Sequence, residues 1–596
     1  MKENNKYKFP MNTNIHIILF MLIGSFVSIF ILLETLNWIY HHHIIVPWND
    51  DMFDHVRMHH AMGNFKSFFA YLISPHNEHR ILTTRIFSYL DEQFALGREY
   101  THTIATVLFQ ALSASIACIL FKKCIPFEFR YINFIIFPFI FLFFISPNFL
   151  YTLIVPFQLQ FAIMQFLCVC TAFVISSAST ENASDIKTQQ KTFLFLIFLA
   201  FIASFTLGNS PTILISSAIT AFILRWNRYT VIALFALAIV HTAIMLDITP
   251  PTGTRSHNVI EIIKFSLIYI GGPFTRVDPW PANFVTWHDS PYFAAICGCI
   301  IFVSAICFAV ARIIRPHLGG RLAIFGFVIL SIVIITSLAA GLARSQFGIL
   351  EALNKKYASF AVMSWLGFYV MISGILLHKK NIRYFLIFTL ISSLMIITLT
   401  LSSLGREERI WSKANDMLWE SALAGFSKIN YHDEVRNMDN IDQDIIDYFQ
   451  YAEVHNLGVF SYFPFRIGDN AQAFLTARKE TGCRGEVEKI TPVPAQSFKY
   501  FDVSGSPASI EGWAWMNDEN KPATTVIAVD TENHIVGVAR STRKSSRAEE
   551  WLSQSFDQNL GWFGFARPNS WKGITFYALT RSGKYYCPLG TLGNAR

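Results

Sequence analysis

Charged residues are scarce in this chain. They make up 15% of its 596 residues, whereas 53% of the residues are hydrophobic and 57 are Phe. The mean hydropathy is +0.38. These values exclude a soluble globular protein and are typical of an integral membrane protein. Charge is also nearly absent from the long apolar runs, apart from Glu34 and Asp247 near two of their boundaries.

Several motifs that would indicate other functions are missing. The sequence has no nucleotide-binding fingerprint, no internal repeat and no low-complexity tract. Cys168-Val169-Cys170 and Cys297-Gly298-Cys299 have apolar flanks and lack the CxxC spacing of a metal site. The basic pI of about 8.8 is explained by Lys and Arg between apolar runs, so nucleic acid is not expected as a partner.

Uncharged apolar runs recur from Ile15 to about Leu401. Roughly 20 helical residues cross a bilayer, and we predict about eleven spans on that basis. The spans are expected at 15–39, 102–121, 131–147, 152–176, 192–207, 211–224, 229–247, 291–311, 322–342, 358–377 and 383–401.

The short runs 192–207 and 211–224 are predicted to form a hairpin and not one kinked span. A hairpin leaves Lys187, Arg225 and the neighbouring cations on one side of the membrane. With this choice every inner loop is basic, the N-terminus is cytoplasmic, and the first run is a retained signal anchor. The loops 40–101 and 248–290, and everything after residue 402, are then expected outside.

The chain is expected to divide into three parts. Residues 1–402 form the membrane domain, and residues 403–495 form an extracytoplasmic linker with helices at 405–428 and 439–452. Short alternating runs predict an antiparallel β-sandwich over residues 496–596.

Two features of the exported part are singled out. Cys483 and Cys587 are its only cysteines, an even pair in a compartment that permits disulfides, so they are a candidate bridge. Trp513, Trp515 and Trp562 could stack on sugar rings, but filling the core is the favoured interpretation.

The loop 40–101 concentrates ionisable side chains beside the first span. Asp50 and Asp51 are the candidates for a general base that takes a proton from an acceptor hydroxyl, and the sequence does not separate them. Asp54 is the third candidate. The alternative role is a helix cap, because Asn49 or Asp50 precedes a run with helical character.

The same loop contains Glu78-His79-Arg80 and Arg85. Arg80 and Arg85 are candidates for binding a phosphate leaving group, because a guanidinium presents a planar fork of donors. His76 and His79 could ligate a divalent metal with Glu78 or an aspartate. Hydrogen bonds to headgroups are preferred because no compact ligand spacing is seen, and no metal ligand or other cofactor is assigned.

Further candidates lie in later loops. Arg344 and Lys356 are cations on an outer loop, against the inside bias, and could bind a lipid phosphate or ordinary anionic headgroups. Arg276 belongs to the loop 248–290, whose stretch 259–270 is interpreted as an interfacial helix and lid. Gln158 and Gln160 could contact sugar hydroxyls or pack between helices.

These residues resemble a known superfamily. The chain is similar to bacterial GT-C glycosyltransferases that use polyprenyl-phosphate-sugar donors. The similarity lies in the long first outer loop with an Asp near its start, in Asn77–Ile81, in Ser146-Pro147-Asn148 with Phe157–Phe161, and in the stretch from Arg344 to Tyr357. The resemblance covers about residues 10–460. It implies a GT-C-like membrane fold and an Asp of the first loop, Asp50 or Asp51, as base. Lys356 stands where related sequences often have Arg.

The resemblance therefore predicts a glycosyltransferase at the periplasmic face of a bacterial inner membrane. It would move a sugar from a polyprenyl phosphate donor to a cell-surface polysaccharide such as the O-antigen of lipopolysaccharide, in contact with membrane lipids. The alternatives are a transporter or flippase of lipid-linked glycans, a glycan polymerase or ligase, and a non-catalytic glycan-binding protein.

Overall fold

The structure is a computed structural model, and it describes residues 11–45, 47–48, 50–76, 79–179, 185–247, 258–275, 290–429, 442–493, 505–552, 560–580 and 582–592. The chain folds into two compact units. The first unit comprises residues 1–42, 72–86 and 102–409. The second comprises residues 43–71, 87–101 and 410–596.

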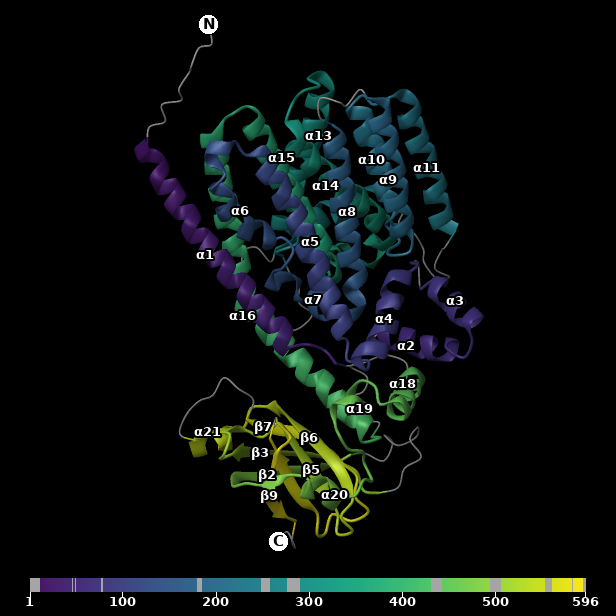
Figure 1. The fold of residues 1–596 in the computed structure, drawn as a ribbon, viewed down its shortest axis with the longest axis vertical. Helices are drawn as coiled ribbons and strands as arrows, with labels where there is room; N and C mark the ends of the chain where they lie inside the picture. The colour runs from purple at the N-terminus through teal and green to yellow at the C-terminus, as the bar shows by residue number, and fades with distance from the viewer. Residues whose placement is uncertain are drawn as a thin grey trace. The chain divides into compact units, whose positions relative to one another are not determined.

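Helices dominate the first unit (Figure 1). Within the described ranges, nine helices are long and apolar enough to cross a membrane. The prediction of a multi-pass helical membrane protein is confirmed. The helices concerned are α1 (Met11–His41), α5 (Tyr100–Cys124), α8 (Leu159–Ala178), α9 (Ile186–Ser204), α11 (Arg228–Asp247), α13 (Pro291–Ile314), α14 (Gly320–Arg344), α15 (Lys355–His378) and α16 (Ile382–Phe426).

Two of the predicted spans are shorter than a membrane crossing. The run 131–147 gives α6 (Ile132–Phe141), with the short α7 (Leu150–Ile154) beginning after it, and 211–224 gives α10 (Pro211–Ile223). Helices α9 and α10 are separate and in contact, as the predicted hairpin requires. Helix α10 begins where Ser210 precedes Pro211, because proline suits the first turn of a helix.

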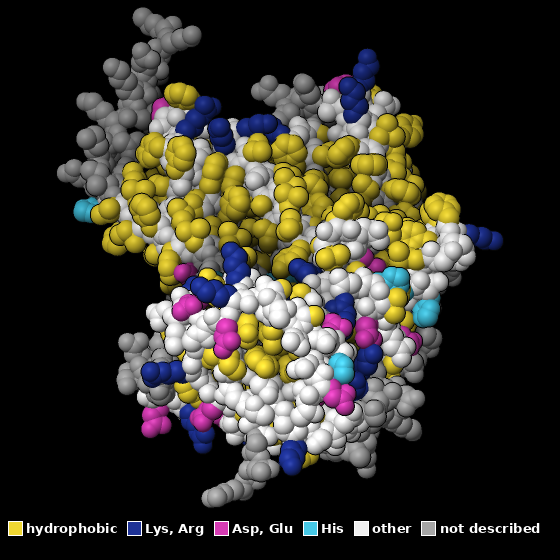
Figure 2. Space-filling model, turned by 60° about the horizontal axis from the view of Figure 1, so that its bottom comes forward, with side chains coloured by type: hydrophobic (Ala, Val, Ile, Leu, Met, Phe, Trp, Pro, Cys, Tyr) yellow, Lys and Arg dark blue, Asp and Glu magenta, His cyan; other side chains and the backbone are white. Residues whose placement is uncertain are grey.

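The helical unit is covered by apolar side chains. Phe26, Ile104 and Ile239 are 71%, 66% and 68% exposed, and many other large hydrophobic residues of these helices are open as well. On the face that Figure 2 presents, hydrophobic side chains form a broad area over the helices, with Lys and Arg mostly at its edges. Such a surface is stable only against lipid, because exposed apolar area of this extent is unfavourable in water.

Helix α12 (Val259–Gly271) packs among the helices of this unit. It contacts α13, α14 and α15. A Cβ on Gly298 of α13 would lie 1.9 Å from the carbonyl oxygen of Leu267, and a Cβ on Gly271 would lie 1.8 Å from that of Ala294. The stretch interpreted as an interfacial lid therefore makes close backbone contacts with α13, as small residues permit in membranes.

The second unit combines helices with one β-sheet. Its helices are α2 (Asp50–Ala61), most of α3 (Phe65–Ile73), the end of α4 (Leu82–Ala95), α18 (Asp442–His455), α19 (Val459–Tyr462), α20 (Ala471–Thr476) and α21 (Ser546–Leu552). Asn64 caps α3, since its side chain accepts a 2.8 Å hydrogen bond from the amide of Ser67. The predicted helix 405–428 is the last part of α16, which continues without a break from the preceding span.

The strands form a single sheet and not the predicted sandwich of two sheets. Their order is β1-β9-β8-β5-β6-β7-β3-β2, with β4 paired to β3. Among the strands that the structure describes, β1 and β9 pair in parallel and the other pairs are antiparallel. The strands are β1 (Lys479–Glu480), β2 (Cys483–Pro492), β3 (Ala508–Met516), β4 (Lys521–Pro522), β5 (Thr525–Val529), β6 (Ile535–Arg543), β7 (Gly561–Ala566), β8 (Thr575–Leu579) and β9 (Tyr585–Thr591).

The sheet must curl on itself. Strands β1 and β2 follow each other closely in the chain, yet they pair at opposite ends of the strand order. Cys483 of β2 and Cys587 of β9 form a disulfide across this gap, with 5.9 Å between their Cα atoms. Alternating strand patterns do not distinguish two facing sheets from one curled sheet, since both bury every second residue. The two strands at 479–492 also lie before residue 496, where the β domain was expected to begin.

Two of the three tryptophans fill the core of the β domain. Trp562 is 1% exposed and packs with Ile510, Phe576 and their neighbours, and Trp513 is 6% exposed and packs with Ala548 and Leu560. Trp515 is half-buried against the same group. The core interpretation is therefore confirmed for Trp513 and Trp562.

Candidate functional site

Helix α2 carries three ionisable side chains on one face. Asp51, His55 and His59 are spaced by four residues and therefore project from the same side of the helix. Their side chains are 1%, 2% and 5% exposed. Burying such groups costs free energy unless they are paired, so their partners define the site.

Two glutamates complete what we call the His55 cluster, which comprises Asp51, His55, His59, Glu92 and Glu99. Oε1 of Glu92 lies 2.8 Å from Nδ1 of His55 and 2.7 Å from Nε2 of His59. On the other edge of the His55 ring, Nε2 lies 3.3 Å from Oε1 of Glu99 and 3.9 Å from Oδ1 of Asp51. One imidazole therefore lies between carboxylates on both sides.

A strained turn positions Glu99. Leu96 and Glu99 have positive φ angles of 58° and 60°, which a side chain with a Cβ rarely adopts. The buried carboxylate of Asp91 holds the turn by accepting 2.7 Å hydrogen bonds from the amides of Glu99 and Thr101. The amide of Gly458 donates to the carbonyl of Leu96 at 2.8 Å. Strain of this kind is found most often at functional sites.

Helix α18 lies beside α2 (Figure 1), and two of its tyrosines contact the histidines. The ring of Tyr448 meets His55 edge-on with 6.3 Å between ring centroids, and the ring of Tyr451 stacks on His59. Burial, reinforced by the charge of Glu99, raises the pKa of Tyr448 well above its usual value. The phenol therefore stays neutral.

The two histidines differ in charge. Burial alone would lower the pKa of His55, but its hydrogen bonds to Glu92 and Glu99 outweigh burial and raise this pKa well above its ordinary value. Burial lowers the pKa of His59, and the hydrogen bond to Glu92 only partly opposes it. We infer that, without a further ligand, His55 is protonated and His59 is neutral near pH 7.

Among the predicted acids, Asp51 is the one that joins the cluster. Asp54 lies on the same helix but accepts a 2.7 Å hydrogen bond from the hydroxyl of Tyr71. The side chain of Asp50 lies outside the described residues, and so does Asn49, so the capping alternative is not decided.

The segment around His79 belongs to the first unit. His76 and His79 exchange backbone hydrogen bonds of 2.7 and 2.9 Å, and the ring of His76 packs on Phe157 with 5.0 Å between centroids. The amide of Gly208, between α9 and α10, donates to Nδ1 of His79 at 3.1 Å. The structure thus brings this segment together with the start of α8, where Gln158 lies.

Gln158 and Gln160 are both buried near this segment. They are 6% and 3% exposed. The side-chain carbonyl oxygen of each has no hydrogen-bond partner among the residues described, while the amide of Gln160 donates to the backbone of Phe157 at 3.2 Å. These two oxygens can accept hydrogen bonds from a polar ligand or from water.

The two arginines of the segment have different surroundings. Arg85 is fully buried, and its guanidinium donates to the carbonyl oxygen and the hydroxyl of Ser74 at 2.6 and 3.0 Å, so it fixes the segment 74–85. Arg80 is half-buried, and its Nε has no partner in the described part of the chain. Arg80 is therefore the better donor for a ligand.

The other predicted cations are also in the first unit. Nζ of Lys356 lies 3.2 Å from Oε1 of Glu351 and above the ring of Tyr357, which compensates its charge locally. Arg344 ends α14, with its guanidinium 6.0 Å from the ring centroid of Phe347. Glu78 and Arg276 lie outside the described residues.

Four residues of the cluster were not predicted as site residues from the sequence: His55, His59, Glu92 and Glu99. The spacing of Asp51, His55 and His59 by four residues was the available signal, since it is the spacing of metal ligands on one helical face. Glu92 and Glu99 had no such signal, because only the fold brings α4 and the turn after it beside α2.

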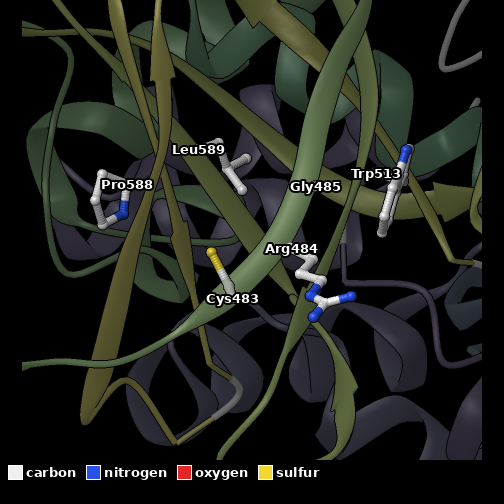
Figure 3. Close-up of a pocket in the computed structure, with 6 residues that line it drawn as sticks. All are labelled: Cys483, Arg484, Gly485, Trp513, Pro588 and Leu589. Atoms are coloured by element: carbon white, nitrogen blue, oxygen red, sulfur yellow. The ribbon is translucent and has the colours of Figure 1, made fainter.

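The β domain has a shallow hollow of about 320 Å³ between β2, β3 and β9. Figure 3 shows its lining, with Arg484 and Trp513 among the six residues labelled. This volume is at the lower limit for a small-molecule site. Because Trp513 is buried, it does not offer an open face on which a sugar ring can stack.

Comparisons with family models, with curated proteins and with solved structures found no match for this chain.

Proposed function

We propose that this protein is a membrane glycosyltransferase that transfers a sugar from a polyprenyl phosphate donor to a polysaccharide outside the cytoplasmic membrane, with O-antigen as the first candidate acceptor. The observation that carries the proposal is Asp51, a buried carboxylate at the start of α2, soon after the first membrane-spanning helix. A base beside the membrane is what a lipid-borne substrate requires.

In the proposed reaction, Asp51 takes the proton of the acceptor hydroxyl as its oxygen bonds to C1 of the donor sugar. The bond between C1 and the phosphate oxygen breaks with its electron pair, and the lipid phosphate leaves. Considered apart from Asp51, Arg80 of the first unit is a candidate for binding a lipid phosphate, because it is half-buried and its Nε has no partner among the described residues. Lys356 of the same unit is paired with Glu351.

The proposal is supported by the polarity around Asp51. Glu99 and His55 lie within the same buried cluster, and such buried titratable groups are more frequent at catalytic sites than elsewhere. Asp518, by contrast, is an exposed acid of the second unit.

The test is Asp51→Asn in the producing bacterium, with surface glycan composition measured by mass spectrometry. We expect the glycan to lose the mass of one sugar residue, because removal of a general base lowers the rate by about 10²–10⁴-fold. Asp518→Asn, an exposed acid of the β3–β4 turn, is the control and should leave the glycan intact. Unaltered glycan in the Asp51 variant at normal protein level would refute the transferase proposal.

A further inference from the structure

We propose that the His55 cluster binds one divalent transition-metal ion of the Zn²⁺ class, with His55, His59 and Glu92 as its protein ligands. This proposal does not depend on the transferase activity. It concerns the three ligand atoms that meet between α2 and α4, all of which lie within 4.8 Å of one another.

The donor set fits such an ion. Two imidazole nitrogens and one carboxylate oxygen are a common set for Zn²⁺, which often keeps a fourth position for water. His55 and His59 are four residues apart on one helix, so both rings reach the same point, while Glu92 comes from a second helix. Both ring nitrogens are directed at the same oxygen of Glu92.

The distances are close to those that an ion requires. Ligands bound to Zn²⁺ at about 2.0–2.1 Å in a tetrahedron lie about 3.3 Å apart. The nitrogens of His55 and His59 lie 2.8 and 2.7 Å from Oε1 of Glu92. A shift of about half an ångström, which rotation of the Glu92 side chain can supply, would open the position.

Glu99 supplies the usual support for a metal-bound histidine. When one nitrogen of an imidazole binds a metal, the other commonly donates to a carboxylate that fixes the ring. Nε2 of His55 lies 3.3 Å from Oε1 of Glu99 and has this arrangement. The strained turn held by Asp91 therefore supports the proposed site, because it places the carboxylate of Glu99 next to Nε2 of His55.

A second group, formed by Asp51, His55 and Glu99, also has ligand atoms within 4.8 Å. It uses the opposite nitrogen of the same ring, so the two groups compete for His55. The group with Glu92 is favoured, because it offers two imidazoles and leaves Asp51 outside the coordination shell. In this arrangement the ion cross-links α2 to α4 and fixes the helix that carries Asp51.

The charges of the cluster also favour a cation. Asp51, Glu92 and Glu99 are 1%, 3% and 0% exposed. Buried carboxylates are costly unless they are compensated. A divalent ion brings two positive charges to the point where these side chains converge.

The experiment uses full-length protein, purified in detergent with an affinity tag that contains no histidine. Bound metal is measured by inductively coupled plasma mass spectrometry, and Co²⁺ is added after chelation. We expect about one zinc ion per chain, and a visible absorption band from tetrahedral Co²⁺. His59→Ala and Glu92→Gln should each reduce the bound metal at least about 10-fold.

Matched controls separate the possibilities. His60→Ala changes the exposed neighbour on α2, and His79→Ala changes a histidine of the first unit; both should retain the metal. Asp51→Asn should also retain it, even where sugar transfer is lost. If Asp51→Asn and Glu99→Gln release the metal while His59→Ala retains it, the ion occupies the other group and the assignment is wrong.

Wild-type protein decides the question even if the variants fail to fold. Absence of zinc together with absence of a Co²⁺ band would show that the cluster is only a hydrogen-bonded group of histidines and carboxylates, and the proposal would be overturned. Metal content is measured without any substrate. A missing metal would therefore refute the metal site without refuting the transferase proposal, and an unaltered glycan would do the reverse.

Discussion

The hydroxyl of Tyr71 donates a 2.7 Å hydrogen bond to Oδ2 of Asp54. Both groups are buried, with Tyr71 5% and Asp54 3% exposed, so this bond fastens α3 to α2. Asp54 is thereby distinguished from Asp51, which faces His55 instead. Of the acids whose side chains are described on this helix, one serves the packing of the loop and the other belongs to the cluster.

Tyr71→Phe is therefore expected to destabilise the loop. It removes the donor and leaves a buried carboxylate less well satisfied, at a cost of about 1–3 kcal/mol. Thermal unfolding in detergent would show a lower midpoint. Tyr89→Phe is the matched control, because Tyr89 packs on Phe68 and has no hydrogen bond from its hydroxyl to the described residues. Equal midpoints for the two variants would count against this role of Asp54.

Arg80 and Arg85 should respond differently to substitution. Arg80→Gln is expected to weaken transfer mainly by raising the KM for the lipid phosphate donor, and Arg80→Lys to recover only part of the loss, because lysine lacks the bidentate fork. Arg85→Lys should instead reduce the yield of folded protein, since the buried guanidinium holds Ser74. A normal KM in Arg80→Gln would remove Arg80 from the donor site.

The contact between α12 and α13 should tolerate no side chain at Gly298. A Cβ there would lie 1.9 Å from the carbonyl oxygen of Leu267, so Gly298→Ala must push two backbones apart. We expect a loss of about 1–3 kcal/mol or more, seen as aggregation at a lower temperature. Gly405→Ala has nothing within 4 Å of the new Cβ and should be neutral or slightly stabilising.

Loss of the disulfide should destabilise the β domain. The double variant Cys483→Ser with Cys587→Ser opens a loop of sequence separation 104, and removing a native bridge costs about 2–5 kcal/mol. Limited proteolysis of intact protein would detect faster cleavage within the sheet. Cys299→Ser, an exposed free cysteine of α13, should leave the cleavage rate unchanged. A double variant that resists protease as well as wild type would contradict this stabilising role.

Much of the membrane domain could be predicted from the sequence, because a bilayer imposes length and polarity directly on each helix. The separation of α9 from α10 was predicted from the cations on either side of the pair, Lys187, Lys191, Arg225 and Arg228. The break between α6 and α7 and the continuity of α16 did not, because apolar composition does not reveal where a helix kinks or how far it extends beyond the lipid.

The candidate site was predictable only in part. Asp51 could be found because it lies near the end of an anchor helix in sequence. Glu92 and Glu99 could not, since their position beside His55 depends on the path of the chain between α4 and α5 and on the strained turn. The curl of the sheet could not be predicted from the sequence either, because it depends on the pairing of β1 with β9, which are far apart in the chain.

The bridge between β2 and β9 also sets an order of events during biosynthesis. Cys483 leaves the ribosome 104 residues ahead of its partner, and β1 has no strand to pair with until β9 follows. The sheet can therefore close, and the disulfide can form, only after synthesis has continued through β9.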